Sequence, residues 1–152
     1  MDQAAQLFLG LQGRIGRQQW WVGFVVLMAF ESAYFWLTDP GYYAAPVASL
    51  ASTVANVVFL FPTTALTVKR CNDRDWPWWL GYVVQLPLLA FIIGDYFGSF
   101  ADDENLTALQ FAVYLSFAVA ILFIVIDNGL LKGTTGTNRF GPDPLNADTR
   151  NT

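Results

Sequence analysis

The sequence predicts an all-α fold: an integral membrane four-helix bundle with cytoplasmic N- and C-termini. Three observations support this prediction. The chain of 152 residues is 55% hydrophobic and only 13% charged, whereas soluble domains carry about twice that share of charged residues. It contains four apolar stretches long enough to cross a bilayer, for which about 20 helical residues suffice. All of its Lys and Arg residues lie on one side of those stretches.

The four apolar stretches lie near residues 20–37, 45–68, 76–97 and 107–131. Because lipid leaves unpaired backbone groups unsatisfied, each stretch is predicted to be a helix. Too little chain connects them for a separate soluble domain, so residues 1–144 are expected to form one membrane domain and residues 145–152 a polar tail. Pro62 and Pro87 are expected to kink the second and third spans.

The charge distribution predicts the orientation of the chain. The cations precede the first span, separate the second from the third, or follow the fourth: Arg14, Arg17, Lys69, Arg70, Arg74, Lys132, Arg139 and Arg150. The opposite loops carry only carboxylates, namely Asp39, Asp102, Asp103 and Glu104. By the positive-inside rule, both termini are expected in the cytoplasm.

The short connection KRCNDRDWPWW, residues 69–79, is interpreted first as a membrane boundary. Lys69, Arg70 and Arg74 are expected to hold it at the anionic lipids of the inner leaflet, at about 1 kcal/mol for each cation. Its tryptophans are expected to anchor the third span at the interface. On this interpretation, replacing Arg70 would mainly weaken lipid attachment.

The two carboxylates of this connection need another explanation, because they oppose attraction to anionic lipid. Asp75 is expected to be the N-cap of the third helix, with Pro77 in its first turn. Asp73 is expected to form an ion pair with a cation of its own loop or of another cytoplasmic segment, where Arg14, Arg17 and Arg139 are the candidates. Loss of Asp73 is therefore expected to cost more stability than loss of Asp75.

Three blocks of the sequence together resemble a known family. They are GRIGRQQWW (13–21), VKRCNDRDWPWWL (68–80) and KGTTGTNRFGPDP (132–144). In this order, and over nearly the whole chain, they are similar to the small inner-membrane family catalogued as domain of unknown function 805. The resemblance implies the fold and a bacterial inner-membrane location, and it brings no established activity. Where the family usually has a histidine this chain has Asn72, which argues against a proton-relay or metal role there.

The polar residues of the three blocks are interpreted as one cytoplasmic cap that joins three segments. Hydrophobic residues recur at helical spacing before the first span, so an amphipathic helix is expected there, with Arg14 and Arg17 on one face. The third block is rich in Gly and Pro and is expected to form turns. The cap is structural or a recognition site, and its candidate residues are Arg14, Arg17, Lys69, Arg70, Asp73, Arg74, Asn138, Arg139 and Asp143.

Among the polar residues within the predicted spans, three are the main candidates, because such side chains are costly there and usually paired or functional. Glu31 is expected either to reach toward the outer interface or to contact another helix. Gln85 is deep enough to need a partner. Asp127 is expected to form an ion pair at the boundary with Lys132, Lys69 or Arg70. Helix packing is expected along a stripe in the second span, formed by Ala44, Ala48, Ser52 and Asn56.

Two classes of function remain. With no His and one Cys, the chain itself cannot form a zinc site, a His-ligated haem, a disulfide or a Ser-His triad. No cofactor is expected, and a net charge of −4 without a basic tract argues against nucleic acid. The favoured class is a non-catalytic accessory or structural subunit that packs against a larger membrane protein complex. The alternative is a homo-oligomeric component of a transporter or channel for a small solute or ion.

Overall fold

The computed structural model describes residues 3–38, 48–100 and 106–147, and within these ranges the chain forms helices and turns without a β-strand. The short terminal helices are α1 (Gln3–Leu9) and α7 (Pro144–Ala147). Between them lie α2 (Arg17–Thr38), α3 (Leu50–Asp73), α4 (Leu80–Val83), α5 (Leu86–Tyr96), α6 (Ala108–Phe123) and the π-helical segment η2 (Ile124–Leu130). The all-α prediction is confirmed.

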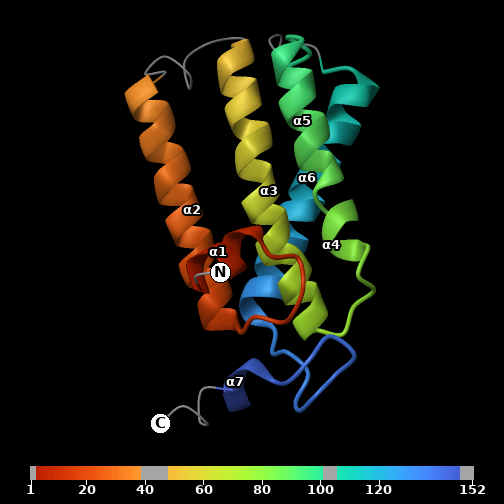
Figure 1. Cartoon of the computed structure of the whole chain (residues 1–152). Coiled ribbons are helices and arrows are strands. Elements are labelled where there is room, and N and C mark those ends of the chain that lie inside the picture. The colour runs from red at the N-terminus through yellow and green to blue at the C-terminus, as the bar shows by residue number, and fades with distance from the viewer. Residues whose placement is uncertain (1–2, 39–47, 101–105, 148–152) are drawn as a thin grey trace.

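Three helices are long and apolar enough to cross a membrane: α2, α3 and the continuous helix Ala108–Leu130 formed by α6 and η2. They match the first, second and fourth predicted spans. The third predicted span, residues 76–97, is shorter, since its helical part covers only Leu80–Tyr96 and is interrupted between α4 and α5. Figure 1 shows α2, α3, α5 and α6 running along the same long axis. That all four cross a membrane, with both termini on one side of it, stays a prediction.

Local sequence explains where the long helices begin. Ser49 caps α3, because its hydroxyl accepts a hydrogen bond from the backbone N–H of Ser52 at 3.1 Å. Thr107 and Gln110 form a capping box at the start of α6, in which each side chain accepts from the backbone N–H of the other residue. The predicted fourth span therefore begins where the sequence indicated.

The two prolines behave differently from each other. The helix α3 continues through Pro62, and the hydroxyls of Thr63 and Thr64 donate to the carbonyls of Phe59 and Leu60 at 3.0 and 2.7 Å. These bonds are of the kind expected beside a proline in a membrane helix. Pro87 instead lies in the first turn of α5, where its missing N–H is not needed. It starts a new helix rather than kinking a continuous one.

The boundary between the second and third spans differs from its prediction. The second predicted span ends at residue 68, but α3 continues to Asp73, so the last turns of this helix carry the polar residues that were expected in a loop. Asp75 follows in a turn with a φ of 59°. The prediction that Asp75 caps the third helix is wrong, because α4 begins at Leu80 and its N-cap is Trp79.

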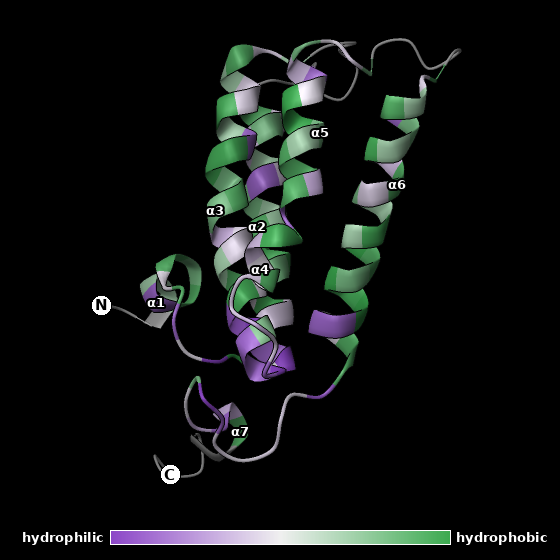
Figure 2. Cartoon of the chain, turned by 90° about the vertical axis from the view of Figure 1, so that its right-hand side faces the viewer, coloured by the Kyte–Doolittle hydropathy of each residue, from purple (hydrophilic) through white to green (hydrophobic). Residues whose placement is uncertain are grey.

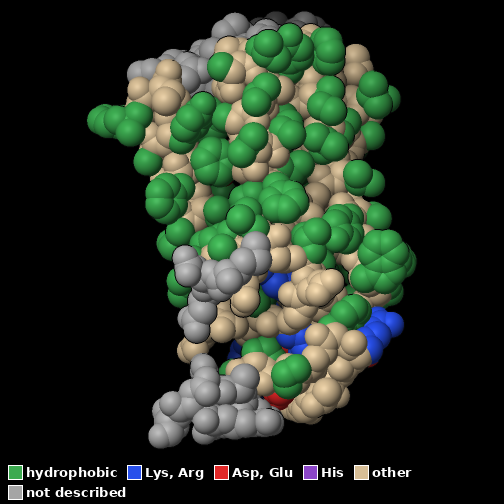
Figure 3. All heavy atoms as spheres, viewed as in Figure 1, with side chains coloured by type: hydrophobic (Ala, Val, Ile, Leu, Met, Phe, Trp, Pro, Cys, Tyr) green, Lys and Arg blue, Asp and Glu red, His purple; other side chains and the backbone are tan. Residues whose placement is uncertain are grey.

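The core lies where the first turns of α2 meet α3 and η2. Its buried side chains are Ile15, Trp20, Leu27, Leu66 and Ile124, and Leu7 and Phe8 of α1 pack against them. The remaining outward faces of the helices are largely apolar (Figure 2). On the face shown in Figure 3, charged side chains gather near one end of the molecule only. This distribution is typical of helices surrounded by lipid.

The packing stripe in the second span stays a prediction, and Ala48 precedes the start of α3 at Leu50. Ala48 and Ser52 are buried and Asn56 is half-buried. The hydroxyl of Ser52 is hydrogen-bonded to the hydroxyl and to the backbone carbonyl of Ser49, the N-cap residue of α3. Several residues of the predicted loops, stripe and tail lie outside the described residues: Asp39, Ala44, Asp102, Asp103, Glu104 and Arg150.

Candidate functional site

The candidate site is a polar cap at one end of the molecule, formed by residues 10–19, 69–76 and 127–145. Its centre is Asp73, the last residue of α3. Oδ1 of Asp73 accepts a hydrogen bond from Nε of Arg14 at 3.0 Å, and Oδ2 accepts from Nη1 of Arg70. The side chains of Asp73 and Arg14 are only 4% and 1% exposed. One buried carboxylate thus lies between two guanidinium groups, and the predicted pairing of Asp73 with Arg14 is confirmed.

The C-terminal loop lies directly against Asp73. The backbone N–H and the hydroxyl of Thr134 donate to the backbone carbonyl of Asp73 at 2.8 and 2.9 Å. A Cβ atom added to Gly133 would lie 1.8 Å from Oδ2 of Asp73, far inside any allowed contact. The close approach of this loop to the carboxylate therefore requires glycine at position 133.

Arg14 ties the same loop to the start of α2. Its Nη atoms donate to three loop carbonyls, those of Thr134 at 2.6 Å, Gly136 at 2.7 Å and Gly141 at 3.2 Å. Arg14 lies in the connection between α1 and α2, and Arg17 is the first residue of α2. The expectation that both arginines share one face of a single helix is therefore wrong. The connection turns at Gly13, whose φ of 86° favours glycine.

Arg70 and Lys69 do not face lipid, contrary to the sequence-based expectation. Arg70 is fully buried, and its guanidinium also donates to the carbonyls of Asn128 (2.7 Å) and Leu131. Lys69 is 2% exposed, and its Nζ donates to the carbonyl of Gln6 at 2.7 Å and to that of Leu7. The last carbonyls of a helix lack partners within the helix. Both cations are drawn inward because they satisfy such carbonyls on η2 and α1.

Other donors from α2 reach the carbonyls of the same π-helical end. Nε1 of Trp21 donates to Gly129 O at 3.0 Å, and Nη1 of Arg17 donates to Leu130 O at 3.0 Å. Gly129 permits this contact, because an added Cβ would lie 2.8 Å from the Trp21 ring. Cations at a helix C-terminus also oppose its negative dipole end. Donors from two other helices, α2 and α3, thus bind the carbonyls of the wider π-helical turn of η2.

Asp127 forms the expected ion pair, with a partner that the sequence did not indicate. Its Oδ1 lies 3.3 Å from Nε of Arg74 and accepts from Nε1 of Trp76 at 3.2 Å. Arg74 also donates from Nη1 to the carbonyl of Lys132 at 2.5 Å. Asp127 therefore joins η2 to the turn that follows α3.

Arg139 holds the outer side of that turn. Its Nε lies 3.0 Å from Oδ1 of Asp75, and Nη2 donates to the carbonyls of Asp75 and Trp76 at 2.8 and 2.9 Å. Both side chains of this ion pair are about half exposed, at 56% for Arg139 and 46% for Asp75. Asn138 lies deeper, where its Nδ2 donates to the carbonyl of Asn72 at 2.9 Å. These contacts confirm that Asn138 and Arg139 join two segments.

Asp143 stabilises its own loop and does not, as had been expected, join two segments of the cap. Its carboxylate accepts from the backbone N–H of Leu145 at 3.0 Å and from that of Gly136 at 3.1 Å. These two hydrogen bonds, with a smaller contribution from the charge of Arg14, hold the pKa of Asp143 below its usual value. Sequence reasoning missed Trp21, Gly133 and Thr134, although all three belong to the blocks that resemble the family.

The other two polar residues of the spans are apart from this cap. Nε2 of Gln85 donates to the hydroxyl of Thr67 at 3.0 Å, so the expected need for a partner is confirmed. Glu31 is half-buried and makes no hydrogen bond or ion pair to another residue in the described ranges. Among those residues, no group of three His, Cys, Asp or Glu side chains is placed to hold a metal ion.

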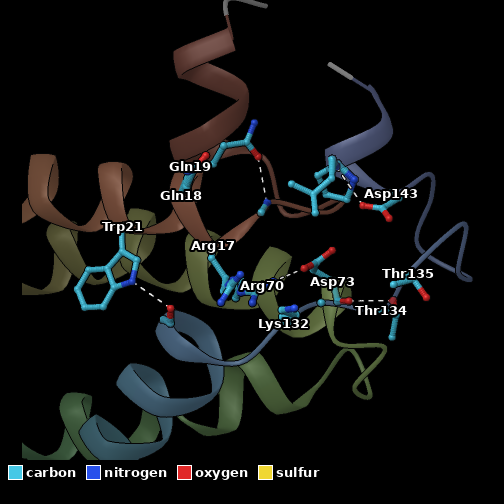
Figure 4. A pocket seen from close by; sticks show the side chains of 15 residues that line it. Arg17, Gln18, Gln19, Trp21, Arg70, Asp73, Lys132, Thr134, Thr135 and Asp143 are labelled. Atoms are coloured by element: carbon cyan, nitrogen blue, oxygen red, sulfur yellow. Dashed lines mark hydrogen bonds and ion pairs between the residues drawn. The ribbon is translucent and has the colours of Figure 1, made fainter. Parts of the chain in front are cut away.

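A cavity of about 680 Å³ opens in the cap, between the start of α2, the end of α3 and the C-terminal loop (Figure 4). Arg17, Arg70 and Asp73 lie together on one wall in this view. The full lining comprises Gly16, Arg17, Gln18, Gln19, Trp21, Arg70, Asp73, Gly129, Lys132, Gly133, Thr134, Thr135, Asp143, Pro144 and Leu145.

Comparisons with known proteins agree with the resemblance seen in the sequence. The family model described as protein of unknown function (DUF805) matches residues 8–142. This range includes all residues of the cap named above except the last three, Asp143, Pro144 and Leu145. The uncharacterized protein YiiR of Escherichia coli K12 is 27% identical over 140 residues, covering 91% of this chain and 88% of the relative. The inner membrane protein YhaH of the same strain is 22% identical over 138 residues, covering 90% and 88%. No solved structure shows a significant match.

Proposed function

We propose that this chain, which belongs to the DUF805 family of proteins of unknown function, is a non-catalytic accessory subunit of a larger complex in a bacterial inner membrane. Two findings support a membrane protein: the relative YhaH is an inner membrane protein, and three helices of this chain are long and apolar enough to cross a membrane. In this proposal the polar cap faces the cytoplasm, because every Lys and Arg of the described residues lies in the cap and the positive-inside rule favours that side.

The observation that carries this proposal is the internal use of the polar groups of the cap. The Asp73 carboxylate is shared between Arg14 and Arg70, and Asp127 is held by Arg74 and Trp76. A catalytic acid or base needs a free proton site within reach of a substrate. Both oxygens of Asp73 are engaged, and Oδ2 of Asp127, which has no hydrogen-bond partner, is buried. These carboxylates fix the ends of helices to one another, which suits a scaffold that presents a defined surface.

Affinity purification of the tagged full chain in a mild detergent tests the proposal. A partner protein recovered in stoichiometric amount is expected, and cross-linking followed by mass spectrometry identifies its contacts. Asp73→Asn is expected to reduce recovery of the partner, because the cap loses its central carboxylate. Asp75→Asn is the matched control, since it alters an exposed ion pair of the same turn. Recovery of the chain alone would contradict the proposal.

A transporter or channel component remains the second candidate, and one observation favours it. The helix is interrupted between α4 and α5 at Gln85, whose Oε1 is buried without a hydrogen-bond partner. Interrupted helices commonly form the substrate sites of transporters. Native mass spectrometry separates the two candidates, because a homo-oligomer without another protein would favour this one. Gln85→Leu should then alter transport while keeping the oligomer.

A further inference from the structure

The cavity in the polar cap has the size of a ligand site. Its volume of about 680 Å³ lies within the range of roughly 300–1,000 Å³ that is typical of small-molecule pockets. Three separate parts of the chain supply its walls: the start of α2, the end of α3, and the segment from η2 to α7. It lies at the start of α2 and the end of α3, which is the depth expected for lipid headgroups if these helices span the bilayer.

Positive charge in this cavity is not fully compensated. Four arginines of the cap have a carboxylate partner: Arg14, Arg70, Arg74 and Arg139. Arg17 and Lys132 line the cavity, are exposed, and have no carboxylate partner in the described part of the chain. Arg17 also opposes the charge of Arg70, although the attraction of Arg70 to Asp73 and Asp127 is larger. An anion between these cations would relieve that repulsion.

Uncharged donors lie beside the two cations. The helix α2 has 22 residues and begins at the cavity wall, so the positive end of its dipole is directed there. Oε1 of Gln19 accepts from the backbone N–H of Gly16 at 3.0 Å, which leaves its amide N–H groups free to donate. The hydroxyl of Thr135 lines the opposite wall. Such donors suit the oxygen atoms of a tetrahedral anion.

Asp143 is the one lining carboxylate besides Asp73 among the described residues, and it forms no ion pair with Arg17 or Lys132. Both of its oxygens accept backbone N–H groups, those of Gly136 and Leu145. Asp73 already lies between Arg14 and Arg70, so two guanidinium groups share its single charge. The described lining thus carries three cations, Arg17, Arg70 and Lys132, against the two carboxylates Asp73 and Asp143, and a bound anion would offset this surplus.

We infer that this cavity binds a phosphate-bearing anion, with Arg17 and Lys132 as its charged contacts and the first turn of α2 as a source of N–H donors. The chemistry is shared by the headgroup of an anionic phospholipid and by soluble phosphate. The inference is based on the cavity and its charges, and it does not depend on the accessory role proposed above.

Direct titration of the full chain, purified and delipidated in a neutral detergent, tests this site at low salt, where screening is weak. One arm uses inorganic phosphate, measured by calorimetry. The other arm uses dioleoyl phosphatidylglycerol in mixed micelles, measured by native mass spectrometry, with dioleoyl phosphatidylcholine as the lipid without net charge. Binding of phosphatidylglycerol alone assigns the site to a headgroup, and comparable binding of inorganic phosphate assigns it to a soluble anion.

Variants then locate the binding. Lys132→Gln and Arg17→Gln are each expected to weaken binding about tenfold, the effect of losing one charge-assisted hydrogen bond. Lys132→Arg should retain the affinity within about threefold. Arg139 belongs to the cap but does not line the cavity. Arg139→Gln should therefore also leave the affinity within about threefold.

Three results would overturn the inference. The first is that neither phosphate nor phosphatidylglycerol binds the parent protein. The second is that Lys132→Gln binds as tightly as the parent. The Lys132 side chain is exposed and makes no described contact, so this variant keeps the fold. The third is that Arg139→Gln weakens binding as much as Lys132→Gln, which would indicate a diffuse positive field without a defined site.

Discussion

Nε of Arg14 lies 3.0 Å from Oδ1 of Asp73, across 59 positions of the chain, and both side chains are almost fully buried. The contact joins the connection before α2 to the last residue of α3. Arg70 completes it from within α3, three residues before Asp73. Removing one partner of a buried ion pair leaves an uncompensated charge, which costs more than the pair itself contributes.

Asp73→Ala is therefore expected to be strongly destabilising. Arg14 and Arg70 would lose their shared counter-ion, at about 3–5 kcal/mol for a buried pair broken on one side. Arg70→Ala is expected to cause a comparable loss, since it also frees the carbonyls of Asn128 and Leu131. The measurement is thermal unfolding in detergent, followed by circular dichroism. This ranking replaces the sequence-based expectation that Arg70 would matter least.

Asp75→Ala is the matched control for this comparison. Its ion pair with Arg139 is about half exposed on both sides, and such pairs contribute about 0–1 kcal/mol. A small shift of the unfolding midpoint is expected. If Asp73→Ala unfolds at the temperature of the parent, the buried ion pair does not stabilise the cap.

Lys69→Met is expected to release α1 from the bundle. The Nζ of Lys69 donates to the carbonyls of Gln6 and Leu7, and Met keeps most of the side-chain volume but none of the donors. Hydrogen bonds to charged groups contribute about 1.5–3 kcal/mol. Hydrogen exchange should increase in residues 3–9 and change little in α3.

Lys132→Met provides the comparison for Lys69, because the Lys132 side chain is exposed and makes no hydrogen bond within the described ranges. It should leave the exchange of residues 3–9 unchanged. Equal protection of α1 in the Lys69 variant and in the parent would show that hydrophobic packing of Leu7 and Phe8 alone holds this helix.

The features that the sequence predicted well depend on local pattern or on charge. Apolar length identified α2, α3 and the helix Ala108–Leu130, because crossing lipid demands such a length. The carboxylate of Asp73 was expected to need a cation of its own loop or of another segment, and Arg14 supplies one. Both inferences use physical requirements that apply before the chain is folded.

The features that the sequence did not predict depend on which groups meet in the fold. Lys69 and Arg70 were expected to face lipid, because the neighbouring sequence does not indicate that carbonyls of α1 and η2 lie beside them. The π-helical end of α6 is stabilised by donors from α2 and α3, including Trp21. Gly133 carries no pattern of its own, and its role follows only from its distance to Asp73.

Cysteine labelling tests the orientation of the chain. The native Cys71 is fully buried, so a new thiol can be read against a low background. Ser99 and Leu145 are both exposed. Ser99 closely follows α5 and Leu145 belongs to α7, and the end of α5 and α7 lie toward opposite ends of the molecule (Figure 1). A maleimide that cannot cross the inner membrane should label Ser99→Cys from the periplasmic side and should not label Leu145→Cys. The reverse pattern would place the polar cap outside the cell.

Gly133→Ala is expected to disrupt the cap through Asp73. The added Cβ would lie 1.8 Å from Oδ2 and 2.5 Å from Cγ of Asp73, so either the loop or the carboxylate must move. Either movement weakens the contacts of Asp73 with Arg14 and Arg70. A loss of roughly 2–4 kcal/mol is expected, within the range for overpacking and for breaking a buried pair.

A double-mutant cycle separates this mechanism from a general effect on the loop. In the Asp73→Ala background the clashing carboxylate is absent, so Gly133→Ala should cost much less than in the parent. Gly16→Ala is the control for adding a methyl group in the cap, because the nearest atom to its Cβ would be Oε1 of Gln19 at 4.0 Å. Thermal unfolding of the four proteins of the cycle measures the coupling. If the two losses of stability are additive, glycine at position 133 is required by the backbone of the loop and not by the carboxylate of Asp73.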